Sequence, residues 1–312
     1  MSRLEKSKVD IILVNWNGGE QLENVIKPLL PPITSSSIEI KIIISDNGST
    51  DNSLDLVSSF PVTIIKNGRN LGFGAACNRV LPICTGEFVL LLNVDTEITI
   101  KTIEDLVAKI GESETYGTIG PRQTNAEGKT HRSCGRFPNF LNSIWELTGL
   151  SKTFPSVFTP SPIMIDWKHD HSKEVDHVIG SCMLIRRKVI DAIGFMDDKF
   201  FVYLEDLDFS KRVRIAGYKN FYYHDVVIYH EGGGLSKKAM AKRLYYSLSS
   251  KKYYWKKHFT RISYYSLLSM ALSIEPLIRI LVAAVTFRGD TLKFTITAYR
   301  YLFKEIIYKV KS

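Results

Sequence analysis

The sequence predicts an α/β domain with a mostly parallel central sheet, followed by a helical, basic C-terminal region. Short apolar runs of strand length alternate with segments of helical spacing, which is the pattern of βαβ units. The run Phe88–Leu92 is apolar at every position, as expected for a strand that helices cover on both faces. Positive charge is concentrated beyond residue 236, so the C-terminal region differs in character from the rest.

The first half of the chain predicts four strands with a helix after each. The strands are expected at Val9–Asn15, Ile38–Ser45, Val62–Lys66 and Phe88–Leu92. The helices are expected to reach Leu30 before Pro31-Pro32, to reach Ser59 after an N-cap in the turn Asp46–Asp51, and to cover Gly72–Ile83 and Ile100–Ile110.

The second half alternates less regularly. Strands are expected at Tyr116–Gly120, within Val175–Arg186 and at Phe221–His230, and helices at Arg186–Ile193, ended by Gly194, and at Glu205–Gly217. Pro121–Pro138 is rich in turn residues. Asn139–His171 contains three prolines and few periodic cues, which indicates an irregular, mobile loop near the acceptor.

Three of the four predicted N-terminal strands end in polar side chains, namely Asn15, Asp46 and the pair Asn93 and Asp95. In open α/β sheets the ligand crevice lies beyond the carboxyl ends of the strands. One such end is equally well a polar turn, whereas several at one edge favour a polar ligand. His230, which also ends a strand, is followed by Gly232–Gly234, and this favours a ligand site over a structural histidine.

The acidic segment around Glu205, Asp206 and Asp208 opens a predicted helix. Acids at this position are often only partners of the helix dipole. The apolar neighbours indicate partial burial, which would raise the proton affinity of a carboxylate pair and suit a general base.

The segment Gly72–Cys77 superficially matches a dinucleotide-binding fingerprint. It follows the third strand instead of the first, and it ends in Cys where that fingerprint has Gly or Ala, so a Rossmann cofactor site is not expected. The helix start remains suited to contact a phosphate or a sugar through backbone amides.

The N-terminal segment Met1–Asp10 is charged and has no apolar core, so no secretory signal is expected. The four cysteines lack C-x-x-C spacing and are interpreted as free thiols in a reducing compartment, without a metal cluster: Cys77, Cys84, Cys134 and Cys182. The protein is therefore expected in the cytoplasm or facing it.

Residues 237–312 carry 16 Lys/Arg against 3 Asp/Glu, a net charge of +13, whereas residues 1–236 carry a net charge of −4. Basic residues alternate with Tyr and Trp around Lys251–Lys257, a composition suited to anionic lipid headgroups. The apolar stretch Ile262–Phe287 is interrupted by Glu275, Pro276 and Arg279, so a membrane-spanning helix is not expected. The alternative is an ordinary helical subdomain with a solvated basic face. Nucleic-acid binding is not expected, because no recognition motif is present.

The chain resembles the family 2 glycosyltransferases of the GT-A fold, in particular their bacterial rhamnosyltransferase-like branch. The matching motifs occur in the expected order over roughly residues 8–240. They are Val14–Asn17, Asp46–Asp51, Asn70–Gly74 with Asn78, Leu92–Asp95, Gly120–Arg122, Arg136–Pro138, Gly180-Ser181, Glu205–Asp208 and His230–Gly233.

The resemblance implies a role for each matching residue. The nucleotide-sugar donor would be bound by Asn15, Asn17, Asp46 (at the pyrimidine base), Asn70, Gly72, Asn78 and Asn93. Asp95 would bind Mg²⁺ or Mn²⁺ as the last acid of the family's metal motif, whose first acid is Asn93 here, and His230 would add a metal or diphosphate contact. Gly180 and Ser181 would face the acceptor. Asp206 would be the general base, supported by Glu205 and Asp208.

The resemblance also implies an inverting, metal-dependent transfer of a sugar, with L-rhamnose favoured, from a dTDP- or UDP-sugar to a polyprenyl-linked or polysaccharide acceptor. The catalytic domain would be residues 1–236 and the membrane-associated region residues 237–312, on the inner face of the cytoplasmic membrane, with a homodimer as an open possibility. A catalytically silent nucleotide-sugar-binding scaffold is one alternative, which the amide of Asn93 keeps open. A sugar nucleotidyltransferase is another, although the loop Asn15–Gly19 lacks the cation it would need.

Overall fold

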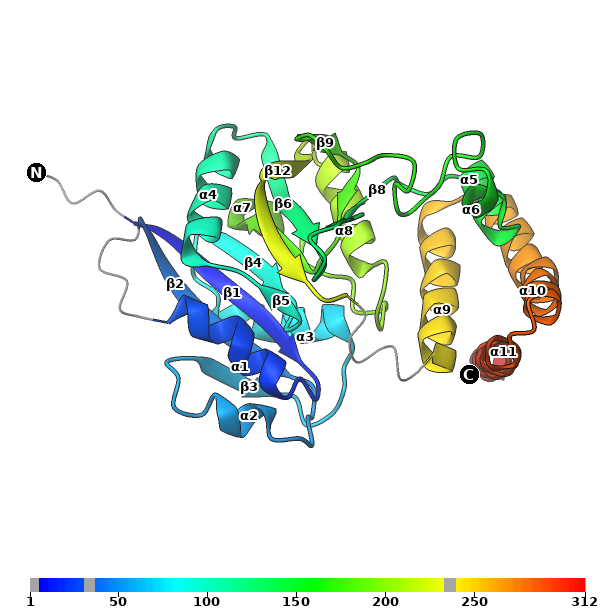
Figure 1. The fold of residues 1–312 in the computed structure, drawn as a ribbon, viewed down its shortest axis with the longest axis horizontal. Helices are drawn as coiled ribbons and strands as arrows, with labels where there is room; N and C mark the ends of the chain where they lie inside the picture. Colours follow the sequence, from blue (N-terminus) through cyan, green and yellow to red (C-terminus); the bar gives the residue numbers. More distant parts are fainter. Residues whose placement is uncertain (1–5, 31–36, 233–239, 312) are drawn as a thin grey trace, which may run out of the picture.

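In the computed structural model, which describes residues 6–30, 37–232 and 240–311, the strands form a ten-stranded sheet and a separate two-stranded one (Figure 1). The strands are β1 (Ser7–Asn15), β2 (Ile38–Asp46), β3 (Thr63–Lys66), β4 (Phe88–Leu92), β5 (Thr96–Glu97), β6 (Tyr116–Thr124), β7 (Thr130–His131), β8 (Cys134–Gly135), β9 (Lys173–Val175), β10 (His177–Val178), β11 (Cys182–Arg186) and β12 (Lys219–His230).

The large sheet has the strand order β3-β2-β1-β4-β11-β6-β12-β5, with β7 paired to β6 and β9 to β12. Strands β3, β2, β1 and β4 are mutually parallel, which confirms the predicted βαβ units. Strand β11 runs antiparallel to both of its neighbours, β4 and β6, and β12 is again parallel to β6.

Helices connect and cover these strands. They are α1 (Glu20–Ile26), α2 (Ser53–Leu56), α3 (Phe73–Val80), α4 (Ile100–Gly111), α5 (Phe140–Leu147), α6 (Leu150–Thr153), α7 (Arg187–Ile193), α8 (Glu205–Ile215), α9 (Met240–His258), α10 (Arg261–Val285) and α11 (Gly289–Lys311), with short 3₁₀ turns at Lys27–Leu29 and Leu81–Ile83. The expected end of the first helix before Pro31-Pro32 falls at residues outside the described ones.

The sheet is buried on both faces because its central strands send alternate apolar side chains to opposite sides. In β1, Ile11 and Leu13 pack with α1 and α4, whereas Ile12 packs with α3, α7 and α8. Strand β4 is buried at all five positions, as its sequence predicts. The two apolar layers fix the sheet and thereby the edge at which its strands end.

Polar strand ends do come together at that edge. Asn15 and Asp46 are directly paired across β1 and β2, and Leu13 pairs with Leu92, the residue before Asn93. The register therefore places Asn15, Asp46 and Asn93 on neighbouring strands at the same end of the sheet, as expected for parallel strands.

The expectation that residues 139–171 form one irregular loop is wrong for their first part, which contains α5 and α6. Helix α5 begins with a capping box, in which the side chains of Asn139 and Asn142 each bond to the other residue's backbone N–H. This signal is present in the sequence, in an unusual form with Asn in place of Glu or Gln. Strand β6 also extends to Thr124, beyond its expected end at Gly120.

Helices α9, α10 and α11 gather at one end of the molecule, with α5 and α6 beside α10 (Figure 1). Tyr254 and Trp255 of α9 pack with Phe200 and Leu207 of the sheet domain and with Leu267 of α10. This shared apolar cluster attaches the basic C-terminal region to the sheet domain. The proposed domain boundary at residues 236 and 237 lies outside the described residues.

Pro276 lies inside α10 without ending it, so the apolar stretch forms one helix of 25 residues. Among the described residues, α10 alone is long and apolar enough to cross a membrane by length and composition, and only 17% of its most apolar window is buried. The expectation that its interruptions disqualify it on these criteria is therefore not supported.

Candidate active site

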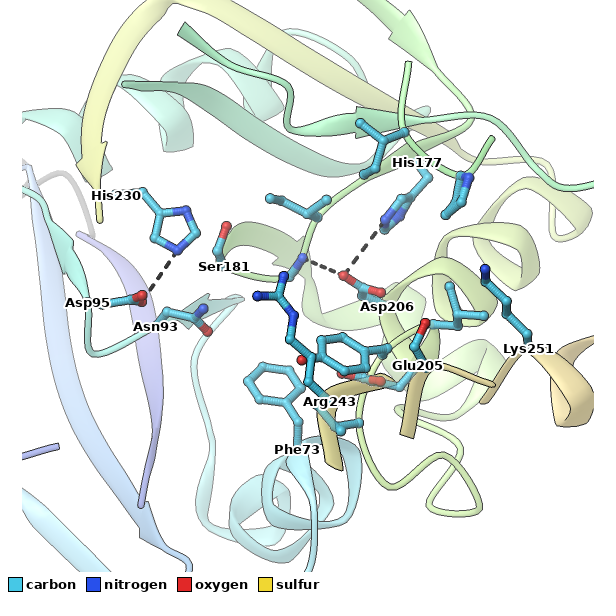
Figure 2. Close-up of a pocket in the computed structure, with 18 of the residues that line it drawn as sticks. Phe73, Asn93, Asp95, His177, Ser181, Glu205, Asp206, His230, Arg243 and Lys251 are labelled. Atoms are coloured by element: carbon cyan, nitrogen blue, oxygen red, sulfur yellow. Dashed lines mark hydrogen bonds and ion pairs between the residues drawn. The ribbon is translucent and has the colours of Figure 1, made fainter. Parts of the chain in front are cut away.

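A cleft of about 900 Å³ lies between the polar end of the sheet and the C-terminal helices. One side is formed by residues that follow β1 and β4 and by the end of β12, including Trp16, Asp95 and His230. The floor contains Gly180, Ser181 and the start of α8, and the far side is formed by α5, α6, α9 and α10. Figure 2 shows that Asp95 and Asp206 approach this space from opposite sides.

Asn15 and Asp46 organise the loop beside the cleft and are themselves buried. The Asn15 amide donates to Oδ1 of Asp46 at 2.9 Å and to the hydroxyl oxygens of Ser49 and Ser53 at 3.0 and 2.9 Å. Oδ2 of Asp46 accepts from the backbone N–H groups of Gly48 and Ser49 at 3.2 Å. These two predicted donor-site residues therefore shape the loop after β2.

The next three predicted donor-site residues also hold backbone in place. Oδ1 of Asn17 accepts from the backbone N–H of Thr50 at 2.7 Å, joining the loops after β1 and β2. Oδ1 of Asn70 accepts from the backbone N–H of Gly72 at 2.9 Å. Gly72 has φ 88°, and a Cβ there would lie 2.0 Å from the carbonyl oxygen of Phe201, so only glycine fits.

Asn78 is placed away from the cleft, where its side chain brackets one peptide group. Its amide donates to the carbonyl oxygen of Met196 at 2.7 Å, and its Oδ1 accepts from the Met196 N–H at 3.1 Å. This pair of bonds ties α3 to the segment before α8. Asn93, by contrast, lines the cleft next to Asp95.

Asp95 and His230 meet at the cleft wall, with His230 Nε2 3.4 Å from Asp95 Oδ1 (Figure 2). The Nδ1 of His230 is 2.7 Å from Oε1 of Gln123, which fixes the ring. Burial by itself would raise the pKa of Asp95, but the hydrogen bond and charge of His230 lower it below the usual value. The Asp95 carboxylate is therefore ionised at neutral pH.

No group of three or more His, Cys, Asp or Glu residues suited to a metal is present in the described part of the chain. Together, Asp95, His230 and Asn93 supply one carboxylate, one imidazole and one amide oxygen. This donor set fits Mg²⁺ or Mn²⁺ held jointly by protein and substrate, because Mg²⁺ is usually bound through one or two carboxylates, several waters and substrate phosphates.

Asp206 sits at the first turn of α8, held by two backbone donors. The N–H of Gly180 donates to its Oδ2 at 2.7 Å and the N–H of Leu207 to its Oδ1 at 2.8 Å. The buried His177 places Nε2 3.7 Å from Oδ2. The Asp206 side chain keeps 19% of its surface exposed toward the cleft, so a substrate hydroxyl can reach it.

Glu205 is buried beside Asp206, and Oε2 has no hydrogen-bond partner among the described residues. Burial, reinforced by the negative charge of Asp206, raises the pKa of Glu205 well above its usual value. Burial therefore favours the protonated form of the Glu205 carboxyl group.

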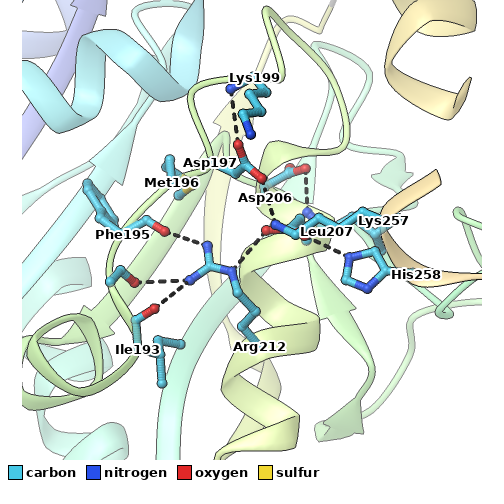
Figure 3. Close-up of polar contacts among 12 residues, drawn as sticks. Ile193, Phe195, Met196, Asp197, Lys199, Asp206, Leu207, Arg212, Lys257 and His258 are labelled. Atoms are coloured by element: carbon cyan, nitrogen blue, oxygen red, sulfur yellow. Dashed lines mark hydrogen bonds and ion pairs between the residues drawn. The ribbon is translucent and has the colours of Figure 1, made fainter. Parts of the chain in front are cut away.

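Asp208 does not line the cleft. Its fully buried carboxylate contacts Arg212 at 2.9 Å, Lys257 at 2.8 Å and His258 at 2.7 Å. Figure 3 shows Arg212 reaching the carbonyl groups of Ile193 and Phe195 from the same cluster, with Lys257 and His258 approaching from α9. Burial would raise the pKa of Asp208, but these hydrogen bonds lower it to about 2. The structure thus gives Asp208 contacts that join α8 to α9.

Several residues at the cleft have no counterpart among the sequence predictions. Gln123 accepts a hydrogen bond from Ser181 Oγ at 3.0 Å as well as contacting His230, so it connects the floor at Ser181 with the side wall at His230. His177 lies three residues before Gly180, where no motif marks it. Arg243, Ser247 and Lys251 recur at four-residue spacing on α9, a signal that was visible in the sequence.

Comparison with known proteins gives a consistent result. The family model described as Glycosyl transferase family 2 matches residues 10–194. The Mycobacterium tuberculosis protein named N-acetylglucosaminyl-diphospho-decaprenol L-rhamnosyltransferase is 23% identical over 229 residues, which cover 68% of this chain and 72% of that relative. The Haloferax volcanii hexosyltransferase Agl10, named for low-salt glycan biosynthesis, is 28% identical over 66% of this chain and 61% of its own length.

Solved structures show the same fold at low sequence identity. The Pyrobaculum calidifontis mannosyltransferase, solved with GDP-Man and Mn²⁺, aligns with a TM-score of 0.55 and 14% identity over 96% of this chain and 88% of that one. Staphylococcus aureus TarS 1–349 aligns with a TM-score of 0.50 and 16% identity over 94% of this chain and 91% of that one.

Proposed function

The chain belongs to glycosyl transferase family 2, and we propose that it transfers a sugar, with L-rhamnose as the favoured sugar, from a dTDP- or UDP-sugar to an acceptor hydroxyl with inversion at the anomeric carbon. Its fold is the GT-A fold expected from the sequence, with a mostly parallel sheet and a helical C-terminal region. The observation that carries the proposal is the placement of Asp95 and Asp206 on opposite sides of one cleft.

Asp206 supports the role of general base because its carboxylate lines the cleft and keeps 19% of its side-chain surface exposed, whereas Glu205 beside it is buried. The bonds from Gly180 and Leu207 orient its carboxylate, which takes the proton of the attacking acceptor hydroxyl. The oxygen of that hydroxyl forms the new bond to the anomeric carbon as the bond to the nucleoside diphosphate breaks. A single base and a single displacement lead to inversion without a covalent enzyme intermediate.

The donor side of the cleft is the wall of Asn93, Asp95 and His230. When Mg²⁺ or Mn²⁺ is bound there, it supplies charge stabilisation for the departing diphosphate. His230 is oriented by Gln123 and thereby positions the Asp95 carboxylate. Trp16 and Phe73, which also line the cleft, provide apolar surface for the nucleoside or the sugar ring.

The acceptor that we propose is a lipid-linked glycan, following the M. tuberculosis relative, whose name gives a diphospho-decaprenol acceptor. Peripheral membrane contact would suit such an acceptor. It is supported by exposed apolar residues along α10, among them Leu277, Leu281 and Val285, and by the basic character of residues 237–312.

A catalytically silent scaffold is the rival that one observation favours, because Asn93 stands where an acid would strengthen metal binding. Release of nucleoside diphosphate from a panel of dTDP- and UDP-sugars, with Mn²⁺ or EDTA and with membrane extract as acceptor source, distinguishes the two. We expect metal-dependent release from one donor, lost in Asp95→Ala and kept in the exposed control Asp198→Ala. Absence of release with every donor would favour the scaffold.

A further inference from the structure

One face of α9 forms a row of polar side chains along the cleft. Arg243, Ser247 and Lys251 are spaced by four residues, so they share a helix face and extend about 12 Å along its axis. Figure 2 shows Arg243 pointing into the cleft, and Lys251 lying on the side of Asp206 opposite to Asp95. The row therefore passes the proposed base and continues toward α10.

The helical wall has an excess of positive charge. It presents four cations, Lys152, Arg243, Lys251 and Arg279, and two carboxylates, Glu146 and Glu275. Lys251 pairs with Glu146 at 2.7 Å and Arg279 with Glu275 at 2.7 Å.

No described residue forms an ion pair with Arg243 or Lys152, which leaves a net charge of +2 on this wall. The two formed pairs are sufficiently explained by the packing of α5, α9 and α10. Arg243 is not explained by packing, because its side chain is exposed in the cleft without a partner there. A guanidinium in such a position is suited to bind phosphate oxygens through two parallel hydrogen bonds.

We propose that the helical wall, centred on Arg243 and extending to Lys251 and Arg279, is a diphosphate-binding subsite for the phosphate-linked part of the acceptor. The proposal rests on the proposed function, since it assigns a place to the acceptor of that reaction. Lys251 lies on the side of Asp206 opposite to Asp95 (Figure 2), and Arg279 belongs to α10, which packs against α9, so both are placed for the acceptor and not for the donor's diphosphate.

The outer surface of α10 adds a second reason for this assignment. Val282 and Val285 follow Arg279 at three-residue steps along the same side of the helix, and they are 53% and 69% exposed. An isoprenoid chain attached to a diphosphate at Arg279 would thus leave the cleft next to exposed apolar surface.

Titration calorimetry with farnesyl diphosphate tests the subsite on the full chain, with saturating UDP or dTDP to occupy the donor site. Arg243→Gln is the test variant, because Arg243 has no described partner whose loss would unfold the protein. Lys242→Gln is the matched control, since Lys242 is the exposed neighbour on α9 and does not line the cleft. Farnesol, which lacks the diphosphate, controls for apolar binding.

We expect Arg243→Gln to weaken farnesyl diphosphate binding about tenfold or more, and Lys242→Gln and farnesol binding to stay unchanged. Equal binding by wild type and Arg243→Gln would overturn the subsite. A variant that loses affinity for UDP or dTDP, and not for farnesyl diphosphate, would assign Arg243 to the donor and overturn the acceptor role. Calorimetry measures binding and does not require turnover. If the wild-type protein bound farnesyl diphosphate but released no nucleoside diphosphate from any donor, the proposed function would be refuted and the binding subsite would stand.

Discussion

The backbone N–H of Gly180 donates a 2.7 Å hydrogen bond to Oδ2 of Asp206. This bond connects the break between β10 and β11 with the first turn of α8, two segments that are 26 residues apart. Its significance is that the orientation of the proposed base depends on a backbone group. A backbone N–H has a fixed position, whereas a side-chain donor could change rotamer and release the carboxylate.

Gly180→Ala tests this dependence. A Cβ at residue 180 would lie 3.3 Å from both Cβ and Oδ2 of Asp206, so the carboxylate must shift by a few tenths of an ångström. We expect kcat to fall about tenfold to a hundredfold with the KM for the donor little changed, since small misplacements of catalytic groups are costly. Steady-state kinetics of transfer would show this. Gly111→Ala, at a helix end with open space around it, is the control, and an unaltered kcat in Gly180→Ala would contradict the positioning role.

Asp206 and Glu205 form a matched pair for assigning the base, because the same change, carboxyl to amide, has opposite expected results. Asp206→Asn removes the carboxylate that faces the cleft, and we expect transfer to fall by about 10² to 10⁴ while nucleotide-sugar binding is kept. Glu205→Gln replaces a carboxyl group whose protonated form burial favours, so turnover should stay within about threefold of wild type. The reverse outcome would make Glu205 the base.

The raised pKa of Glu205 also predicts the pH dependence of stability. A group whose pKa is raised by folding contributes stability below its unfolded value, near 4.5, and loses that contribution as the pH rises. Glu205→Gln removes the titration. Urea unfolding should therefore show little difference between wild type and variant at pH 4 and a more stable variant at pH 8. An advantage that shrinks with rising pH would refute the burial argument.

Much of this architecture could be predicted from the sequence, for identifiable physical reasons. The strand Phe88–Leu92 is fully apolar because both of its faces are covered, and Asn15, Asp46 and Asn93 share an edge because parallel strands end together. The helix after Asn139 was missed because its capping box uses a second Asn at the position where Glu or Gln is usual. The role of Gly72 as a close contact with Phe201 depends on a residue 129 positions away, which no local pattern reveals.

The acidic segment shows the limit of such prediction within one helix turn. Glu205, Asp206 and Asp208 look equivalent in the sequence, yet Glu205 is buried at the cleft floor, Asp206 is part-exposed to the cleft and Asp208 is held by a cluster of cations. Helical rotation of 100° per residue separates them, but which direction faces the cleft depends on α9, which supplies Lys257 and His258. The four-residue spacing of Arg243, Ser247 and Lys251 is visible in the sequence. That this face of α9 forms a wall of the cleft depends on tertiary packing, so the sequence does not predict it.

Asp208→Asn tests whether this residue is structural. Folding lowers its pKa from 3.8 to about 2, so it contributes stability above pH 4 that is lost as the pH falls toward 2. The difference corresponds to about 2 kcal/mol in the free energy of unfolding at pH 7. We expect Asp208→Asn to lose about this amount in urea unfolding at pH 7 and to unfold less steeply with acid than wild type.

The exposed Asp191, paired with Arg187 on α7, provides the control for Asp208→Asn. Asp191→Asn should cost under about 0.5 kcal/mol because surface pairs contribute little. If Asp208→Asn kept full stability and lost transfer per folded molecule, Asp208 would belong to the catalytic machinery, as the resemblance implied.

Membrane contact through α10 is the remaining prediction that the structure makes specific. Removing residues 237–312 would not test it cleanly, because α9 packs against Phe200 and Leu207 and lines the cleft. The double variant Leu277→Ser/Leu281→Ser leaves that packing intact, since both side chains are mostly exposed. Each leucine that enters the lipid interface contributes about 1.5–3 kcal/mol when fully buried, so we expect co-sedimentation with anionic liposomes to weaken at least about tenfold.

Circular dichroism should be unchanged, and Ile215→Ser, at an exposed apolar residue of α8, should bind like wild type. Undiminished binding by the double variant would show that α10 does not contact the membrane.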